Sequence, residues 1–308
     1  MALQLVSYVD LPPHAKTGGF DHAAVHRGTG RVYVAHTAND AVDVIDGLTH
    51  RYVGSIRDLP GVAGALVSEQ HDLVFTSNRG ENTVGMFSPT AEGSVSKVSV
   101  GVRPNGLAYD PGRRRLLAAN VGDPSLPGSH TLSIVDVEKK TLTAEVPVAG
   151  RTRWTVFDAE REVFHVNIAD PPQIVVVDAR DPGATRRVVP IPSAGPHGLD
   201  LAGATRRLFC ACDGGQLVEV HADSGEITRQ IEIGGVPDVV FFNAALERLY
   251  VAIGDPGCIE VVDTRTMRHR ETVRTEKDAH TLAFDPTSNT VYAFLPETHR
   301  AAVYVDRD

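Results

Sequence analysis

The chain has 308 residues, of which 42% are hydrophobic and 22% are charged, as in a globular protein with a large apolar core. Its formal net charge of −9 argues against nucleic acid or an anionic membrane as the main partner. The sequence holds no run of about 18 apolar residues, which excludes a membrane-spanning helix.

The N-terminus and the cysteines favour a cytoplasmic protein. Residues 1–8 lack a basic region followed by an apolar run, so we expect no secretory signal in this chain, although a signal removed upstream would leave no trace. The three cysteines, Cys210, Cys212 and Cys258, give no disulfide framework and are expected to be free thiols.

The predicted elements are short strands throughout. The first covers residues 3–11 and resembles residues 52–60. From there the chain divides into seven repeats of about 42 residues. Each repeat holds β-rich runs bounded by Gly, Pro, Asp or Asn, such as 103–111, 115–120 and 132–136. The repeats begin near residues 20, 62, 104, 152, 196, 237 and 279.

Four strands per repeat at this period are typical of propeller blades. We therefore predict that residues 1–308 form one all-β domain, a seven-bladed β-propeller with four-stranded blades. The seventh repeat supplies only three strands before the chain ends, so strand 3–11 is expected to complete the last blade and remove an exposed edge.

The repeats resemble those of a known family. Residues 32–35 (VYVA) with 39–46 (NDAVDVID), and residues 249–252 (LYVA) with 259–263 (IEVVD), look like the YVTN-repeat propellers, and the resemblance covers all seven repeats. It implies the propeller fold and two kinds of function. Some such proteins are surface-layer or periplasmic scaffolds, whereas related propellers are enzymes, such as virginiamycin B lyase, the gluconolactonase group and the phosphogluconolactonases.

The first residue of each innermost strand is expected at one mouth of the central channel. The equivalent positions form an inner ring of Asp21, Ala63, Asn105, Arg153, His197, Asp238 and His280. Four of its members come from consecutive blades and are expected to hold a divalent metal ion, Zn, Mn, Fe or Ni: His197, Asp238, His280 and Asp21. Arg153 stands beside them and is expected to bind a carboxylate or a developing oxyanion.

A second ring comes from the ends of the second strands. His36 from this ring, with His22, is a candidate for proton transfer, whereas polar contacts to the substrate are expected from Asn78, Asn105, Asn120 and Asn167. Other readings stay open: mouth residues often bond only to channel water, and Asn often caps a turn. Trp154 is expected to pack between blades, because successive strand side chains point to opposite sides.

These residues predict a metal-dependent hydrolase of a lactone or ester, or a lyase, acting on a small polar or carboxylated metabolite. The inner ring has no Glu, which departs from the pattern of lactonase-type and lyase propellers. The alternative is a non-catalytic scaffold that binds a peptide or protein partner. The oligomeric state is left open.

Overall fold

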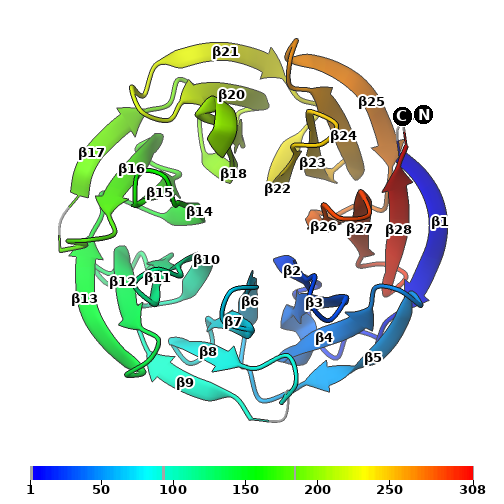
Figure 1. Cartoon of the computed structure of the whole chain (residues 1–308), viewed down its shortest axis with the longest axis horizontal. Coiled ribbons are helices and arrows are strands. Elements are labelled where there is room, and N and C mark those ends of the chain that lie inside the picture. Colours follow the sequence, from blue (N-terminus) through cyan, green and yellow to red (C-terminus); the bar gives the residue numbers. More distant parts are fainter. Residues whose placement is uncertain (1–2, 92–93, 184, 308) are drawn as a thin grey trace.

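The computed structural model describes residues 3–91, 94–183 and 185–307. Within these ranges the strands form seven antiparallel sheets of four, arranged around a central channel (Figure 1). Each sheet is one blade, and its first strand lies closest to the channel. The predicted seven-bladed propeller is therefore confirmed.

The first four blades follow one another along the chain. Blade 1 holds β2 (Ala23–His26), β3 (Arg31–His36), β4 (Ala41–Asp46) and β5 (Arg51–Ile56). Blade 2 holds β6 (Val62–Ser68), β7 (Leu73–Asn78), β8 (Thr83–Phe87) and β9 (Ser96–Ser99). Blade 3 holds β10 (Pro104–Asp110), β11 (Arg115–Asn120), β12 (Thr131–Asp136) and β13 (Thr141–Pro147). Blade 4 holds β14 (Thr152–Asp158), β15 (Val163–Ile168), β16 (Gln173–Asp178) and β17 (Thr185–Pro190).

The remaining blades complete the ring. Blade 5 holds β18 (Pro196–Ala202), β19 (Arg207–Cys212), β20 (Gln216–His221) and β21 (Ile227–Glu232). Blade 6 holds β22 (Val236–Asn243), β23 (Arg248–Asp255), β24 (Cys258–Asp263) and β25 (Arg268–Arg274). Blade 7 holds β26 (Thr281–Asp285), β27 (Thr290–Leu295), β28 (Arg300–Asp306) and β1 (Leu3–Asp10).

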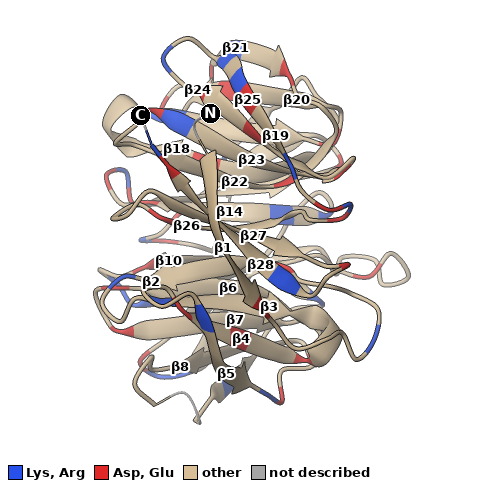
Figure 2. Cartoon of the chain, turned by 90° about the vertical axis from the view of Figure 1, so that its right-hand side faces the viewer, with Lys and Arg blue, Asp and Glu red and all other residues tan. Residues whose placement is uncertain are grey.

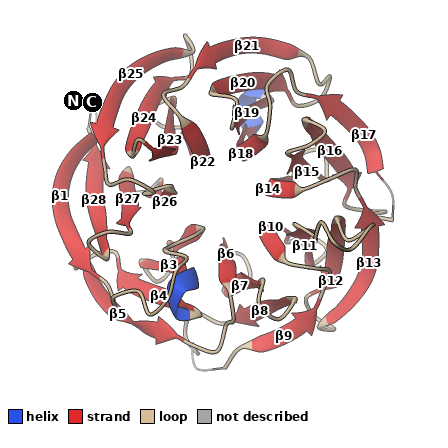
Figure 3. Ribbon diagram, turned by 180° about the vertical axis from the view of Figure 1, so that it is seen from behind, coloured by secondary structure: helices blue, strands red, loops and turns tan. Residues whose placement is uncertain are grey.

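Helical structure is confined to two short 3₁₀ turns, η1 (Thr37–Asn39) and η2 (Gly203–Thr205), in the described residues (Figure 3). In that same part of the chain, no helix is long and apolar enough to cross a membrane.

The blades bury their second and third strands on both faces. β15 and β27 are buried along their whole length, whereas the outer strand β21 is mostly exposed. Neighbouring blades cover both faces of the middle strands, so these strands are apolar almost without interruption. The Asp that closes many third strands acts as a turn residue, as expected: Asp46 accepts hydrogen bonds from the backbone N–H groups of Leu48 and Thr49.

The N-terminal strand closes the ring. β1 pairs antiparallel with β28, from Leu3 opposite Asp306 to Asp10 opposite Arg300. The two ends of the chain therefore lie side by side on the rim (Figure 2). This confirms that the last blade is completed from the start of the chain.

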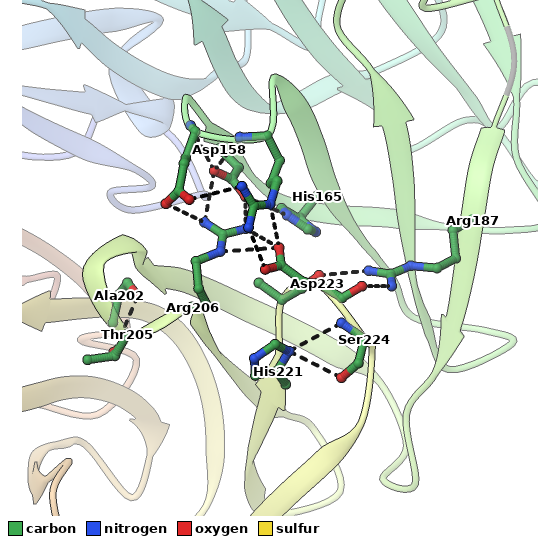
Figure 4. A network of polar contacts seen from close by, with 12 residues as sticks. Asp158, His165, Arg187, Ala202, Thr205, Arg206, His221, Asp223 and Ser224 are labelled. Carbon is green, nitrogen blue, oxygen red and sulfur yellow. Dashed lines mark hydrogen bonds and ion pairs between the residues drawn. The ribbon is translucent and has the colours of Figure 1, made fainter.

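An ion-pair network joins blades 4 and 5 at the ends of their inner strands, on the side away from the candidate site (Figure 4). Arg206 contacts Asp158 and lies 2.7 Å from an Asp223 oxygen. Burial alone would raise the pKa of Asp158, but its contacts with His165 and Arg206 hold that pKa well below its usual range. Asp158, Asp223 and Arg206 each have a partner of opposite charge, and Arg187 donates to the backbone carbonyls of Ala222 and Asp223, so we interpret this network as structural.

Candidate functional site

Five of the seven inner-ring residues lie at shifts of strand register, whereas Asp21 and His280 lie just before β2 and β26. The strand register shifts between Pro196 and Gly198 in β18, and between Pro237 and Val240 in β22. These shifts bracket His197 and Asp238, and equivalent shifts bracket Asn105 in β10 and Arg153 in β14. A bulge turns its extra residue away from the regular pleat, so these side chains turn toward the channel mouth.

Three of the predicted ligands come together. His280 Nδ1 lies 2.6 Å from Asp238 Oδ2, and His197 Nε2 lies 3.1 Å from Asp238 Oδ1. All three line a pocket of about 590 Å³ at the mouth, which we call the mouth pocket. His280 lines the pocket, its side chain is 32% exposed, and Nε2 makes no hydrogen bond within the described residues.

This chain of contacts continues into blades 5 and 4. His197 Nδ1 lies 2.7 Å from Asp213 Oδ1, and Asp213 Oδ2 lies 3.2 Å from an Arg153 nitrogen. A second Arg153 nitrogen lies 3.0 Å from His197 Nε2. The structure therefore places Arg153 beside the imidazoles, as predicted, and adds Asp213, which the sequence analysis missed. Asp213 directly follows Cys212, the last residue of β19, whereas the second ring was built from the last residues of the second strands.

Asp21 belongs to a different set of contacts. Its Oδ2 lies 3.1 Å from an Arg79 nitrogen, and Arg79 also donates to Asn105 Oδ1. Asp21 makes no hydrogen bond or ion pair with His197, Asp238 or His280. The two sets of contacts together involve all seven blades.

The electrostatics of the mouth raise the pKa of both imidazoles. Burial lowers the pKa of His280, but the hydrogen bond to Asp238 and the negative charge of that residue outweigh it and raise the pKa to about 9. Burial likewise lowers the pKa of His197, and the charge of Asp238 raises it above its usual value. Burial would raise the pKa of Asp238, yet the two imidazoles hold it well below its usual range.

The predicted metal ligands do not form a metal site as they are placed. Both Asp238 oxygens and both ring nitrogens of His197 already have polar partners, and Asp21 is paired with Arg79. In the described ranges, no group of three or more His, Cys, Asp and Glu side chains is placed to hold a metal ion. The bound metal therefore stays a prediction from the sequence, and we derive no step through it.

Neither of the two proton-transfer candidates lines the mouth pocket, although His36 contacts His14, which does. His36 is fully buried, with Nδ1 2.6 Å from Asp43 and Nε2 2.7 Å from His14. It ends β3, the second strand of blade 1, which the neighbouring blades cover. Because both ring nitrogens already have partners, neither is free to transfer a proton to a ligand. His22 lies deeper in the channel, with its ring 4.2 Å from that of Trp154, and burial lowers the pKa of its imidazole.

The asparagines at the second-strand ends bond to the protein itself. Asn78 donates to Thr83, and Asn120 donates to Thr131 and Ser133. Asn78, Asn120 and Asn167 are all fully buried. Asn167 donates to the backbone carbonyls of His197 and Gly198, so it holds the bulge that presents the imidazole. Only Asn105, of the four predicted substrate contacts, belongs to the mouth network.

The sequence analysis missed three arginines on blades 2 to 4, Arg79, Arg103 and Arg151, which together with Arg153 we call the arginine arc. Burial, then the positive charges of Arg153, Arg79 and Arg103, lowers the pKa of Arg151. Arg103 and Arg151 also line a hollow of about 360 Å³. A signal was present: Arg103 and Arg151 each stand two residues before an inner-ring position, in equivalent places of adjacent repeats.

The comparisons with known proteins show the fold alone. No family model and no curated protein matches the sequence. A chain in the crystal structure of the mitotic checkpoint complex is similar in structure, with a TM-score of 0.84, 10% identity, and coverage of 99% of this chain and 92% of that one. A chain of Kuenenia stuttgartiensis hydrazine synthase is similar too, with a TM-score of 0.83, 11% identity, and coverage of 96% and 97%. The protein is thus a seven-bladed β-propeller, with identity too low for these neighbours to indicate its function.

Proposed function

We propose that the mouth pocket binds a small carboxylated molecule and that His280 transfers a proton to it, in a hydrolase or lyase reaction. The observation that carries this proposal is the His280–Asp238 pair. Asp238 fixes the imidazole through Nδ1, which leaves Nε2 without a protein partner in the described residues, on a partly exposed side chain that lines the pocket. A carboxylate that orients an imidazole in this way is a recurring arrangement in acid–base catalysis.

The charges around the mouth define how a ligand lies. None of the residues of the arginine arc lines the mouth pocket, but their positive charges attract a carboxylate on the side of blades 2 to 4, where Arg151 makes no ion pair within the described residues. On the side of blades 6 and 7 the pocket is lined by Asp255, Asp278 and Glu297, with Lys277 as the only cation besides the imidazoles. A carboxylate is therefore directed toward the arginines, which leaves the reacting end of the molecule at His280.

The protonation state of His280 favours a general acid. With its pKa near 9, the imidazole is protonated at neutral pH. Asp238 stabilises the charged ring, and Nε2 then gives its proton to the leaving oxygen as the C–O bond breaks. In the opening of a lactone or ester, water adds to the acyl carbon and loses its second proton to solvent. In an elimination, the proton on the adjacent carbon leaves to solvent as the double bond forms. Solvent returns the proton afterwards. The resemblance to YVTN-type propellers and their enzyme relatives supports the same reaction classes.

A scaffold is the second candidate function. The similar chain in the mitotic checkpoint complex belongs to an assembly, and the present fold matches it over nearly its whole length. A scaffold would bind a peptide or protein at the mouth and would need no proton transfer.

Binding is tested by titrating the protein with acetate, succinate, malate and citrate while its Tm and the heat of binding are measured. Arg151→Gln is expected to weaken carboxylate binding about tenfold, because one charge-assisted contact is lost. Arg51→Gln is the matched control, since Arg51 is exposed on the outer strand β5. If no carboxylate binds to the wild-type protein, the proposal fails.

Catalysis is tested separately with a panel of lactones and 2-hydroxy acids, followed by acid release or by the absorbance of a new double bond. His280→Gln is expected to keep carboxylate binding and to lower turnover at least 100-fold, the usual contribution of a general acid. Carboxylate binding without turnover of any panel member by the wild-type protein would favour the scaffold. Elemental analysis of untagged protein decides whether a stoichiometric metal is present.

A further inference from the structure

The channel contains a second hollow, toward the end opposite the mouth. Its volume is about 500 Å³, and residues of all seven inner strands line it. The lining reaches from His22, next to the mouth network, to Gln70 and Pro111 just past the ends of β6 and β10. We call this hollow the inner pocket. Its size is that of small-molecule sites, and it shares no lining residue with the mouth pocket.

Aromatic rings form one side of the inner pocket. The Phe241 ring centroid lies 6.3 Å from that of Trp154 and 6.3 Å from that of Phe284, with interplanar angles of 89° and 40°. All three side chains pack against the core on one side and are only partly buried. Trp154 was expected to pack only between blades, but the bulge in β14 also brings it to the channel. All three aromatic residues therefore line the pocket and are only partly covered by the core.

The charge of the inner pocket is negative. Asp200 and Glu69 are in the lining, which contains no Lys or Arg; Glu69 is paired with Arg27 outside the lining, so Asp200 carries the unpaired charge. Asp200 accepts hydrogen bonds of 2.7 Å from the backbone N–H groups of Leu201 and Phe242 and has no ion pair with any described residue. Burial raises the pKa of Asp200 to about 6, so it is still mainly a carboxylate at neutral pH. His22 adds no opposing charge, because burial lowers the pKa of its ring.

We propose that the inner pocket binds a small organic cation, an amine or quaternary ammonium with apolar substituents. Asp200 supplies the opposite charge, and the faces of Trp154 and Phe241 attract the cation through their π-electrons. A neutral apolar molecule would leave the Asp200 carboxylate without a counter-charge, and an anion would be repelled by Asp200 and Glu69. The proposal does not depend on the function of the mouth pocket.

The chain offers a direct reporter, because Trp154 is its only tryptophan. We would titrate the full chain with benzyltrimethylammonium and follow the Trp154 fluorescence, with benzyl alcohol as the neutral probe and benzoate as the anion. The expected result is a saturable change for the cation, at least tenfold weaker binding of benzyl alcohol, and no binding of benzoate. Absence of a saturable change with the cation, or equal affinity for benzyl alcohol, would overturn the proposal.

Two substitutions then locate the site. Asp200→Asn is expected to weaken cation binding at least tenfold, whereas Asp181→Asn, at an exposed position, is the matched control and leaves it unchanged. Because Asp200 also accepts backbone hydrogen bonds, Phe241→Leu gives an independent test: it keeps the carboxylate, removes one ring face and is expected to weaken binding about threefold to tenfold. Wild-type affinity in either folded variant would overturn the assignment.

Discussion

His280 shows how one residue gains its properties from neighbours on other blades. The ring comes from blade 7 and its carboxylate partner, Asp238, from blade 6. Burial and the nearby carboxylate act in opposite directions on the imidazole, and the carboxylate prevails because it lies within hydrogen-bond distance. The charge on His280 is therefore a property of the pair.

The pKa of His280 is the first prediction. In an NMR titration of its ring protons we expect a midpoint near 9, and in Asp238→Asn a midpoint at or below about 6.5, because burial then acts without the opposing carboxylate. Because its pKa is raised by folding, the protonated form of His280 stabilises the folded protein. The contribution of His280 is complete below the unfolded value of about 6.5 and is lost as pH rises through about 9. A wild-type midpoint near 6.5 would contradict this account.

The elements that shape the site are the bulges and the strand ends. β14, β18 and β22 each have a shift of register near the mouth, and the shifted residues are Arg153, His197 and Asp238. The opposite ends of the inner strands carry contacts between blades, such as that of Asp158 at the end of β14 with Arg206 of blade 5. The candidate site thus lies at one end of the inner strands, and contacts that join the blades lie at the other end.

Asp158→Asn is expected to lower the free energy of unfolding by about 3 kcal/mol, because it leaves the Arg206 guanidinium without its buried partner. Glu160→Gln, an exposed neighbour of the same network, is the control and should change it by about 0.5 kcal/mol or less. Urea unfolding measures both. The pKa of Asp158 is depressed, so its contribution is present above about pH 4 and is lost only as pH falls through the lower folded value. Equal effects of the two substitutions would show that the network does not stabilise the fold.

Closure of the ring is a property of the whole molecule. β1 is far from β28 in sequence, yet it supplies the outer strand of blade 7 and covers the edge that β28 would otherwise expose. Leu3 and Val9 of β1 are also buried.

Deletion of residues 1–12 is therefore expected to lower the Tm by more than about 10 °C, since it removes a ladder of backbone hydrogen bonds and buried apolar surface. Tyr8→Thr keeps the ladder and changes only a half-exposed side chain, so it should have a Tm within about 2 °C of wild type. A thermal melt of each protein decides the matter: a truncated chain that unfolds like the wild type would rule out this mode of closure.

The sequence by itself determined the number of blades, the four-stranded blade and the closing strand. These features follow from local patterns that recur in every repeat: turn residues at fixed places and β-rich runs between them. The repeat also placed Arg153, His197, Asp238 and His280 at one mouth, because equivalent residues of a radial array share one height along the axis.

Only the tertiary structure decided which of these residues are partners. The pairing of Asp21 with Arg79 and the burial of His36 depend on how side chains of different blades meet, and the contact of His197 with Asp213 depends on a side-chain direction that a bulge sets. A bulge adds a single residue to a strand and changes the direction in which its side chain points, and one extra residue is hard to recognise in the repeat pattern. The inner pocket could not be predicted either, because its lining comes from seven strands that meet only when the ring has closed.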